Sequence, residues 1–561
     1  MESISKNIVL KNNELNKYEY FILVKERTGY FIIQPLIDKT KKIYEFKDYS
    51  ILKVFYESKT IIGIKKGIVL FYTYKFCKKE NKLLLNCIQE LDKFENVCSY
   101  ELSSKFNYLT IIQHPSIKDN LKLLKIYYSN YDNIIEYKNN FTYEIVYSCK
   151  STLNPSNGYW PQIRLNSQEN LIMKKINEDL EIVSMEIPEH KYCIKKVYDL
   201  ALCNFISENE LLEYIVLVRE KSSINKKNPK KIITNTVISI YTIKDIFLYF
   251  KNNFNISTSI KDNKSNDNQS NNAELKFYFE TAVSQMTRTT ITLSKNNNYC
   301  LISSICDQST STSYYGSSIL YYVNIPKKNI KKLTQLKEGP ILDYNFSIDN
   351  TKFYIVCGHQ PCSVYSFDTS NGNYISEIAN EFKVNNMRLS NNGKLMCLFG
   401  YGNLPGDICS LNVESNNKTN SKNINNLVGI SNVFGSREVE YSQDSKLLLT
   451  SVISPYLNID NDFKVHLYNC ELVDSYMFEY SIYMCKWLYI YNSFDIKEMN
   501  NSNKYDNYKI VVSNSVNEYN NKKTKNTLNQ SINKPNNQNK AIKSNKQSNE
   551  LIKPVFFNSN K

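Results

Sequence analysis

Four histidines supply the imidazole groups available for acid–base chemistry in this chain of 561 residues. They are His114, His190, His359 and His466, and they lie far apart in the sequence. Such isolated histidines more often have structural or surface roles than catalytic ones. The chain has no G-x-S-x-G nucleophile elbow, no G-x-x-x-x-G-K-[ST] phosphate loop and no G-x-G-x-x-G dinucleotide motif. The sequence therefore predicts a protein that is not an enzyme, with no cofactor and no small-molecule substrate.

The 14 cysteines are scattered as single residues, and no C-x-x-C pair occurs. Cys357 and Cys362 have His359 between them, but this spacing is poor for a metal site and no second pair follows. Scattered single cysteines are typical of buried, reduced thiols in a reducing compartment. We therefore expect free thiols, no metal and a cytoplasmic location.

No segment has the composition of a membrane anchor or a secretion signal. The first 17 residues lack an apolar core of signal-peptide length. The longest apolar stretch, residues 237–250, contains Lys244 and Asp245. It is also shorter than the ~20 residues that a membrane-spanning helix needs. We expect a protein without a membrane partner.

Basic side chains are the groups best suited to binding a partner. The formal net charge is +15, and residues 499–561 contain 11 lysines but only 3 acidic residues. A positive excess suits a polyanion such as RNA or an acidic protein surface. A second basic cluster lies in the word NKKNPKK, at Lys226, Lys227, Lys230 and Lys231. An RNA contact and a simple solvated insertion are both open for it.

A repeated pattern indicates the elements that position such groups. Four segments share a serine, a short polar turn and then a run of apolar residues, with a weaker fifth copy at 165–177. The serines are Ser294, Ser347, Ser390 and Ser442, at spacings of 53, 43 and 52 residues. Pairs such as Asn392-Gly393 tolerate tight or left-handed turns. Each copy therefore predicts a β-hairpin.

Each predicted hairpin is followed by a further strand of alternating apolar and polar residues. These strands lie at 317–323, 363–368, 408–413 and 464–469. A period of about 45–50 residues thus holds about four short strands, as in WD40 propeller blades. Similar strands at 65–76 and 121–130 place the start of the propeller near the N-terminus. The pattern favours an all-β, WD40-like β-propeller, and residues 244–251 are compatible with one short amphipathic helix.

Four segments rich in Asn, Lys and Ser contain too few apolar residues to offset the entropy of ordering. Three of them lie between strand patterns and predict loop insertions near 224–231, 255–272 and 414–425. The fourth forms the C-terminal end of the chain. We therefore predict a propeller over residues 1–498 and a disordered Asn/Lys-rich basic tail over residues 499–561.

Five short sequence motifs, here called words, follow one another between Ala282 and Trp487, in register with the blade period. They are STSYYG (311–316), GPILD (339–343), FYIVCGHQPCSVYSFD (353–368), LFGYGNLPG (398–406) and SPYLNIDNDFKVHLYN (454–469). In type and order they resemble the words of the eukaryotic translation initiation factor 2A family. Tyr483 and Trp487 stand where that family has the two tryptophans of W-x-x-x-W. The resemblance covers a little over a third of the chain.

The resemblance implies a propeller of nine blades in one disc. It also implies a factor that helps to place initiator methionyl-tRNA on the small ribosomal subunit, without GTP and in response to the start codon. The partners it implies are the small ribosomal subunit, initiator tRNA, mRNA and other initiation factors. The alternative is a general WD40 protein-interaction scaffold without an RNA role.

The chain lacks several basic residues of the family pattern. Asn385 occupies a position where the family pattern has arginine, and Ser363 one where it has lysine. Tyr456 and Asn458 occupy the positions of two further arginines. Basic side chains are the usual phosphate ligands in RNA complexes. These losses predict that RNA contacts, where present, have moved to other loops and to the tail.

The candidate RNA or ribosome contacts are therefore aromatic and amide groups in the words, and lysines outside them. Adjacent Tyr314 and Tyr315 are suited to stacking on bases or to filling a gap between blades. Tyr401 and Asn403 adjoin Gly400 and Gly402, a pattern that fits either a tight turn or a ligand loop. The lysine candidates are Lys226, Lys227, Lys230, Lys231, Lys522, Lys523 and Lys525.

Deletion of residues 499–561 tests the role of the tail. We expect lower affinity for RNA and a shallower dependence of that affinity on salt, because the tail carries a net charge of +8. Fluorescence anisotropy of a labelled RNA across a salt series measures both, and circular dichroism checks that the fold is intact. Unchanged binding would instead place the RNA-binding surface on the blades.

Overall fold

The computed structural model describes most of the chain between residues 19 and 491. The described residues are 19–91, 93–103, 105–127, 142–150, 163–176, 178–186, 191–207, 210–225, 228–259, 277–284, 288–306, 317–334, 336–414, 426–458, 460–491, 512–513 and 515–516. The chain forms two compact units, Met1–Ser513 and Asn514–Lys561. Every strand among the described residues lies in the first unit.

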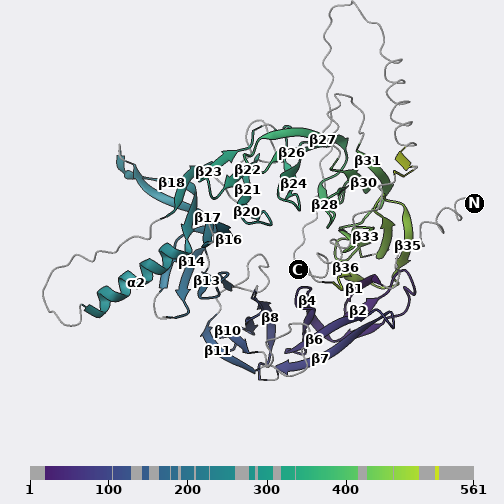
Figure 1. The fold of residues 1–561 in the computed structure, drawn as a ribbon, viewed down its shortest axis with the longest axis horizontal. Coiled ribbons are helices and arrows are strands. Elements are labelled where there is room, and N and C mark those ends of the chain that lie inside the picture. The colour runs from purple at the N-terminus through teal and green to yellow at the C-terminus, as the bar shows by residue number, and fades with distance from the viewer. Residues whose placement is uncertain are drawn as a thin grey trace, which may run out of the picture. The chain divides into compact units, whose positions relative to one another are not determined.

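Nine four-stranded antiparallel sheets follow one another around a ring in the first unit (Figure 1). This confirms the nine-bladed propeller. Eight blades are each built from four consecutive strands, and the first strand of each lies nearest the ring centre. Blade 1 consists of β4 (Tyr49–Phe55), β5 (Thr60–Lys65), β6 (Ile68–Cys77) and β7 (Lys82–Leu91), and blade 2 of β8 (Val97–Leu102), β9 (Tyr108–Gln113), β10 (Leu121–Tyr127) and β11 (Thr142–Cys149). Blade 3 consists of β12 (Ile163–Leu165), β13 (Leu171–Ile176), β14 (Asp179–Ser184) and β15 (Lys191–Ile194), and blade 4 of β16 (Val197–Ser207), β17 (Glu210–Asn225), β18 (Asn228–Thr242) and β19 (Phe279–Val283).

The region of the five words forms the next four blades. Blade 5 consists of β20 (Arg288–Leu293), β21 (Tyr299–Cys306), β22 (Ser317–Asn324) and β23 (Asn329–Lys332), and blade 6 of β24 (Ile341–Phe346), β25 (Lys352–Cys357), β26 (Cys362–Asp368) and β27 (Tyr374–Phe382). Blade 7 consists of β28 (Asn386–Leu389), β29 (Leu395–Phe399), β30 (Asp407–Asn412) and β31 (Leu427–Asn432), and blade 8 of β32 (Glu438–Tyr441), β33 (Leu447–Val452), β34 (Asp462–Leu467) and β35 (Leu472–Met477). The strands expected after each serine turn are the second and third strands of these blades.

The ninth blade closes the ring with strands from both ends of the unit. β36 (Ile482–Leu488) is its inner strand, and β1 (Phe21–Glu26), β2 (Gly29–Ile33) and β3 (Tyr44–Lys47) complete the sheet. β1 and β36 are antiparallel, with Ile22 opposite Trp487 and Val24 opposite Cys485. The two ends of the propeller are therefore held by a backbone ladder.

The core lies between neighbouring blades rather than inside each one. The second strands β29 and β33 are buried along their whole length, as expected for strands covered on both sides. One cluster joins Ile62 and Phe71 of blade 1 to Tyr100 and Ile111 of blade 2. Each blade is thus stabilised by the apolar faces of its neighbours.

The serine turns form as the sequence predicts. The Ser390 Oγ donates to Asn392 Oδ1 at 2.7 Å, and the Leu395 N–H donates to Ser390 Oγ at 3.0 Å. Gly393 supplies the left-handed residue of the turn, with φ of 74°. The same contacts recur at Ser294, Ser347 and Ser442. In the weaker fifth copy, the Asn166 side chain takes the place of the serine and accepts from the Leu171 N–H.

These turns also form hydrogen bonds with residues of neighbouring blades. The Asn392 N–H donates to Ser445 Oγ at 3.0 Å, which joins blade 7 to blade 8. The Asn297 Nδ2 donates to Asn204 Oδ1 at 2.7 Å, which joins blade 5 to blade 4. The polar turn residues therefore bridge blades as well as ending hairpins.

Carboxylates on the innermost strands provide a second link between blades. Asp199 accepts from the Ile291 N–H and Asp343 from the Met387 N–H, each at 2.9 Å and each on the next blade. At the ring closure, Glu440 accepts from the Trp487 N–H at 3.0 Å, and the Trp487 Nε1 donates to the Glu440 carbonyl at 3.1 Å. Burial raises the pKa of Glu440 from 4.5 to about 7.

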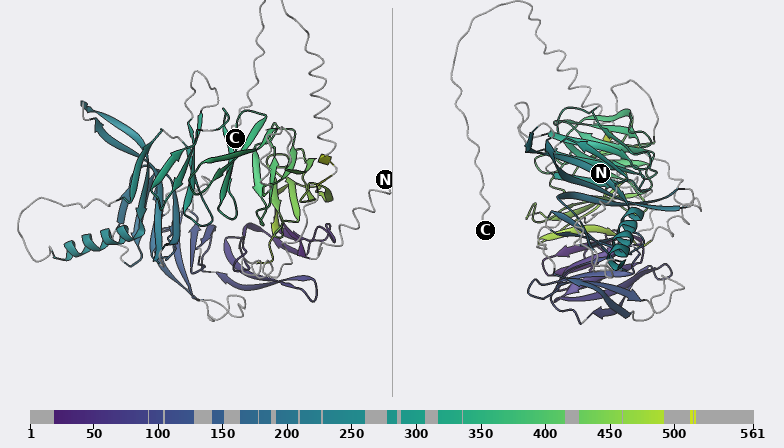
Figure 2. Two further views of the ribbon diagram at one scale, coloured as in Figure 1. Left: turned by 45° about the horizontal axis from the view of Figure 1, so that its top comes forward. Right: turned by 90° about the vertical axis from the view of Figure 1, so that its left-hand side faces the viewer.

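The insertion expected near 224–231 takes a different form from the irregular loop that was predicted. β17 and β18 run beyond the sheet as a two-stranded hairpin, from the pair Glu220–Thr236 to the pair Asn225–Asn228. β16 reaches only to Arg219 and β19 only to Thr236, so neither accompanies this extension. The hairpin projects past the ring in Figures 1 and 2. β-branched Ile and Thr residues in β18 explain why strand pairing continues.

A helix follows this hairpin, as the pattern at 244–251 indicates. α2 (Ile243–Ser259) is longer than predicted and includes the first part of the insertion expected at 255–272. The Asp245 N–H donates to Thr242 Oγ1 at 3.0 Å and caps its start. Ile246 and Phe250 pack on blades 3 and 4. Residues 260–272 and 415–425, and residues 499–561 apart from 512–513 and 515–516, lie outside the described residues.

Glu440 makes the ring closure sensitive to pH. Its raised pKa means that the folded state keeps a proton which the unfolded state releases, so stability falls as pH rises from 4.5 to about 7. Glu440→Gln keeps an acceptor for the Trp487 N–H but carries no charge. We expect the variant to gain on the order of 1–3 kcal/mol over the wild type between about pH 5 and about pH 8. Urea unfolding of both proteins measures this, and parallel pH profiles would contradict it.

Candidate functional site

The loops divide between two faces of the disc. In a four-stranded antiparallel blade, the turns between strands one and two lie on one face, here called the turn face. The loops between strands two and three, and the links from one blade to the next, lie on the other, here called the linker face. The four serine turns belong to the turn face.

Most of the described loop residues of the five words belong to the linker face. Residues 358–361 connect β25 to β26, residues 400–406 connect β29 to β30, and residues 453–461 connect β33 to β34. Gly339 and Pro340 lie in the link from β23 to β24. Words that are separate in the sequence therefore meet on one surface, which is the candidate site.

Asn385 holds the loop at 400–406 in place. Its Nδ2 donates to the Tyr401 carbonyl at 3.1 Å, and its Oδ1 accepts from the Tyr401 N–H at 3.2 Å. Asn385 thus stands at a position where the family pattern has arginine, and it acts here on the backbone of the neighbouring loop. Its contacts are structural.

Two glycines of this loop are required by close backbone approaches. A Cβ on Gly400 would lie 2.6 Å from the Lys383 carbonyl, and one on Gly406 would lie 2.6 Å from the Phe434 Cα. Gly402 has φ of 78° with open space around it. These positions support the tight-turn interpretation. They also leave Asn403 exposed and Tyr401 half-buried.

Arg437 lies between two tyrosine rings on this face. Its guanidinium carbon is 4.0 Å from the ring centre of Tyr401 and 3.9 Å from that of Tyr456. Arg437 belongs to the link from β31 to β32, and its backbone N–H donates to the Ser451 carbonyl at 2.9 Å. The loop that lacks arginines at 456 and 458 therefore has an arginine beside it, from another part of the chain.

Large apolar side chains are exposed around this stack. Phe434 is 68% exposed and Tyr456 is 57% exposed. Gly435 lies against Leu457, which brings the 433–437 link next to the 453–461 loop. Exposed aromatic groups beside an arginine are typical of binding surfaces.

Sequence reasoning missed Arg437 and Phe434. They occur in the short word FGSR between two strand patterns, with no repeat or basic cluster to mark them. The available signal was an arginine in a blade-to-blade link, because these links lie on the linker face together with the words.

Most of the RNA or ribosome contacts predicted from the sequence lie outside the described residues. Lys230 and Lys231 lie on β18 in the projecting hairpin. Tyr314, Tyr315, Lys226, Lys227, Lys522, Lys523 and Lys525 lie outside the described residues. Their role in binding stays a prediction.

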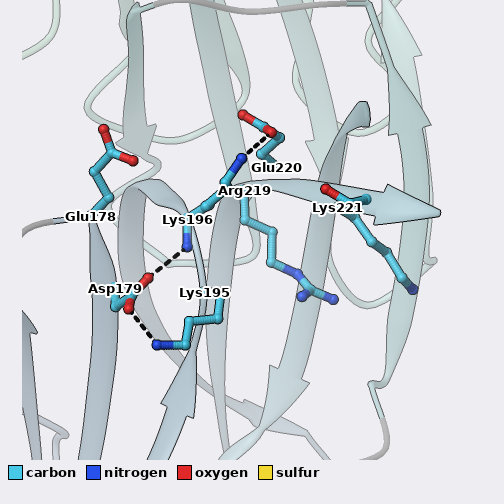
Figure 3. Close-up of a pocket in the computed structure, with 8 residues that line it drawn as sticks. Glu178, Asp179, Lys195, Lys196, Arg219, Glu220 and Lys221 are labelled. Carbon is cyan, nitrogen blue, oxygen red and sulfur yellow. Dashed lines mark hydrogen bonds and ion pairs between the residues drawn. The ribbon is translucent and has the colours of Figure 1, made fainter. Parts of the chain in front are cut away.

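A charged groove of about 720 Å³ lies at the base of that hairpin (Figure 3). It is lined by Glu178, Asp179, Lys195, Lys196, Arg219, Glu220, Lys221 and Ser222. Lys195 pairs with Asp179 at 2.7 Å and Lys196 with Glu220 at 2.5 Å, and these hydrogen bonds lower the pKa of both acids. Arg219 pairs with Glu280. The groove is an ion-pair network rather than a small-molecule pocket.

The histidines and cysteines occupy varied positions. His466 is buried, its Nε2 lies 3.3 Å from Thr450 Oγ1, and burial lowers its pKa to about 4. His359 is exposed, and His190 lies outside the described residues. The described cysteines are free thiols, and eight of them are buried. The expectation of buried thiols is wrong for Cys87 and Cys193, which are exposed.

No helix within the described ranges is long and apolar enough to cross a membrane. Those ranges also contain no group of three or more His, Cys, Asp or Glu residues placed to hold a metal ion.

Comparison with known proteins identifies the region that carries the words. Residues 281–484 match the family model "Eukaryotic translation initiation factor eIF2A". The protein "Eukaryotic translation initiation factor 2A" of Schizosaccharomyces pombe is 32% identical over 153 residues, which cover 27% of this chain and 25% of that protein. Its namesake in Dictyostelium discoideum is 28% identical over 180 residues, which cover 32% of this chain and 27% of that protein. The matched part spans about a quarter of each relative's length.

A solved structure shares the propeller fold over a longer stretch. It is described as a "crystal structure of the eukaryotic initiation factor", with a TM-score of 0.57 and 16% identity. The superposition covers 83% of this chain and 98% of that one.

Asn385→Ala tests whether this residue positions the loop at 400–406. We expect a loss of about 1–3 kcal/mol in the free energy of unfolding, because the variant leaves the backbone groups of Tyr401 without these partners. Urea unfolding measures the loss. The control is Lys383→Ala, a substitution of a nearby exposed side chain, with an expected change of about 0.5 kcal/mol or less. Equal effects of the two changes would contradict a positioning role for Asn385.

Proposed function

Because the chain belongs to the eukaryotic translation initiation factor 2A family through residues 281–484, we propose that it acts as a non-enzymatic platform in translation initiation. In this proposal it binds the small ribosomal subunit and assists the GTP-independent, codon-dependent delivery of initiator methionyl-tRNA. mRNA and other initiation factors are its further partners, and its place of action is the cytoplasm.

The arrangement of the words on the linker face carries this proposal. Blades 6 to 8 present the described words in loops that are held by hydrogen bonds, such as those between the Asn385 side chain and the Tyr401 backbone. Loops on a rigid scaffold are a common setting for binding residues. A closed ring of nine blades keeps these loops at fixed distances from one another. That geometry suits docking on a large, preformed partner.

The positions of the lysines support a partner that is rich in phosphate. The projecting hairpin of β17 and β18 has lysines near its tip and no acidic residue between Lys221 and Lys231. A two-stranded hairpin is marginally stable alone, and a binding partner would stabilise it. In our proposal these lysines contact the phosphate backbone of ribosomal RNA, and the lysines of the tail add further salt-dependent contacts.

Co-sedimentation with purified small ribosomal subunits tests the proposal. We expect the full-length protein to move with the subunit at low salt and to dissociate as salt rises, because phosphate contacts release counterions. If the protein stays in the light fractions at low salt, the initiation-factor proposal fails and the scaffold alternative is favoured.

A lysine series shows which surface makes the contact. Lys226, Lys227, Lys230 and Lys231 are changed together to Gln, and we expect a roughly tenfold or greater loss of subunit affinity at moderate salt. The control changes four exposed lysines of hairpin β6–β7, namely Lys75, Lys78, Lys79 and Lys82, which removes the same charge elsewhere on the disc. Equal losses in both variants would indicate general attraction rather than docking through the projecting hairpin.

A further inference from the structure

The stacked arginine of the linker face has an uncommon environment. Tyr401 and Tyr456 cover the two sides of the Arg437 guanidinium at 4.0 and 3.9 Å. Among the described residues, no carboxylate lies within ion-pair distance of this group. Arg219, by contrast, is paired with Glu280 at 2.7 Å. The charge of Arg437 is thus held in place without being neutralised.

Stacking fixes the plane of the guanidinium and leaves its edge for hydrogen bonding. The N–H groups of arginine point outward in that plane, in a fork that matches the oxygens of a phosphate or carboxylate. An arginine already held by two rings loses less side-chain entropy on binding than a free one. The arrangement is therefore preorganised for an anion.

Both rings are themselves held by their loops. Asn385 fixes the backbone of Tyr401 by two hydrogen bonds. On the other side of the stack, the loop of Tyr456 is tied by Ser454 Oγ, which donates to Asn458 Oδ1 at 2.6 Å. The stack does not depend on chance packing of flexible side chains.

The surface next to the anion site is aromatic and open. Tyr456 is 57% exposed although it stacks on Arg437, and Phe434, three residues before Arg437, is 68% exposed. Aromatic rings that adjoin a cationic group provide a stacking surface for nucleic-acid bases, whatever the base. This surface therefore accommodates a phosphate and the bases next to it.

We propose that Tyr401, Phe434, Arg437 and Tyr456 form a binding site for single-stranded RNA. Arg437 binds a phosphate of the strand, and Tyr456 and Phe434 stack with adjacent bases. This inference deepens the proposed function and rests on it, by assigning an RNA contact to the linker face. An acidic peptide would satisfy Arg437 alone, whereas the two exposed rings and the net charge of +15 favour a nucleic acid.

Photo-crosslinking of the full-length protein to an oligouridylate of about ten nucleotides carrying 4-thiouridine tests the site. We expect mass spectrometry to find crosslinked peptides that contain Tyr456 or Phe434. In Arg437→Ala, these crosslinks fall about tenfold, as does the affinity assigned to the site by competition with unlabelled RNA. Crosslinks confined to the tail or to the projecting hairpin would overturn the proposal.

Conservative variants separate binding from folding. Tyr456→Phe keeps the ring and is expected to retain crosslinking, whereas Tyr456→Ala loses it. Arg437→Lys keeps the charge but not the planar fork, and we expect it to behave more like Arg437→Ala than like the wild type. The control is Lys47→Ala, a change at an exposed lysine on a different blade. Thermal unfolding of each variant identifies any change that acts through stability.

Two outcomes distinguish this inference from the proposed function. If the Arg437 and Tyr456 variants bind small ribosomal subunits and crosslink RNA like the wild type, the inference fails and the proposed function stands. If the same variants lose binding to a glutamate-rich peptide but not to RNA, the surface is a protein-binding site and the RNA assignment is overturned.

Discussion

Face-to-face packing of neighbouring blades is the interaction on which the propeller depends. The second strands are buried on both faces, and their apolar clusters combine residues of two blades, as Ile62 and Tyr100 do. A blade alone would expose both of these faces to water, at a cost of about 25 cal/mol for each Å² of apolar surface. Only a closed ring covers every blade on both sides. The pairing of β1 with β36 is the step that satisfies this condition.

The two faces of the disc have different roles: the turn face stabilises the blades, and the linker face carries loops with exposed side chains. On the turn face, serine and asparagine side chains close hairpins and bond across blade boundaries, as at Ser390 and Asn392. On the linker face, the loops differ in length and carry exposed aromatic groups such as Phe434. Glycines such as Gly406 let these loops approach the backbone of the next link. The turns of one face thus stabilise the blades, and the loops of the other face present exposed side chains.

The sequence predicts the parts of this fold that are local. The turns at Ser294, Ser347, Ser390 and Ser442 are recognisable because a serine and an Asx residue two positions later form a self-contained unit. The number of blades comes from the family resemblance, since the first blades have few such serines. For the hairpin extension of β17 and β18 the sequence predicts a loop, because lysines and asparagines conceal the strand pattern. The stack of Tyr401, Arg437 and Tyr456 joins three loops, and the spacing of these residues in the sequence does not predict that they are in contact.

The mixed origin of the ninth blade has a consequence during synthesis. Strand β1 emerges from the ribosome early, but its partner β36 is made only after the eight intervening blades. At about 5–20 residues per second, the first three strands wait for tens of seconds with one edge unpaired. An uncovered apolar edge of this kind is prone to pair with another nascent chain. The architecture that gives the finished disc its rigidity therefore creates a need for protection of its first strands, which a chaperone at the tunnel exit would meet.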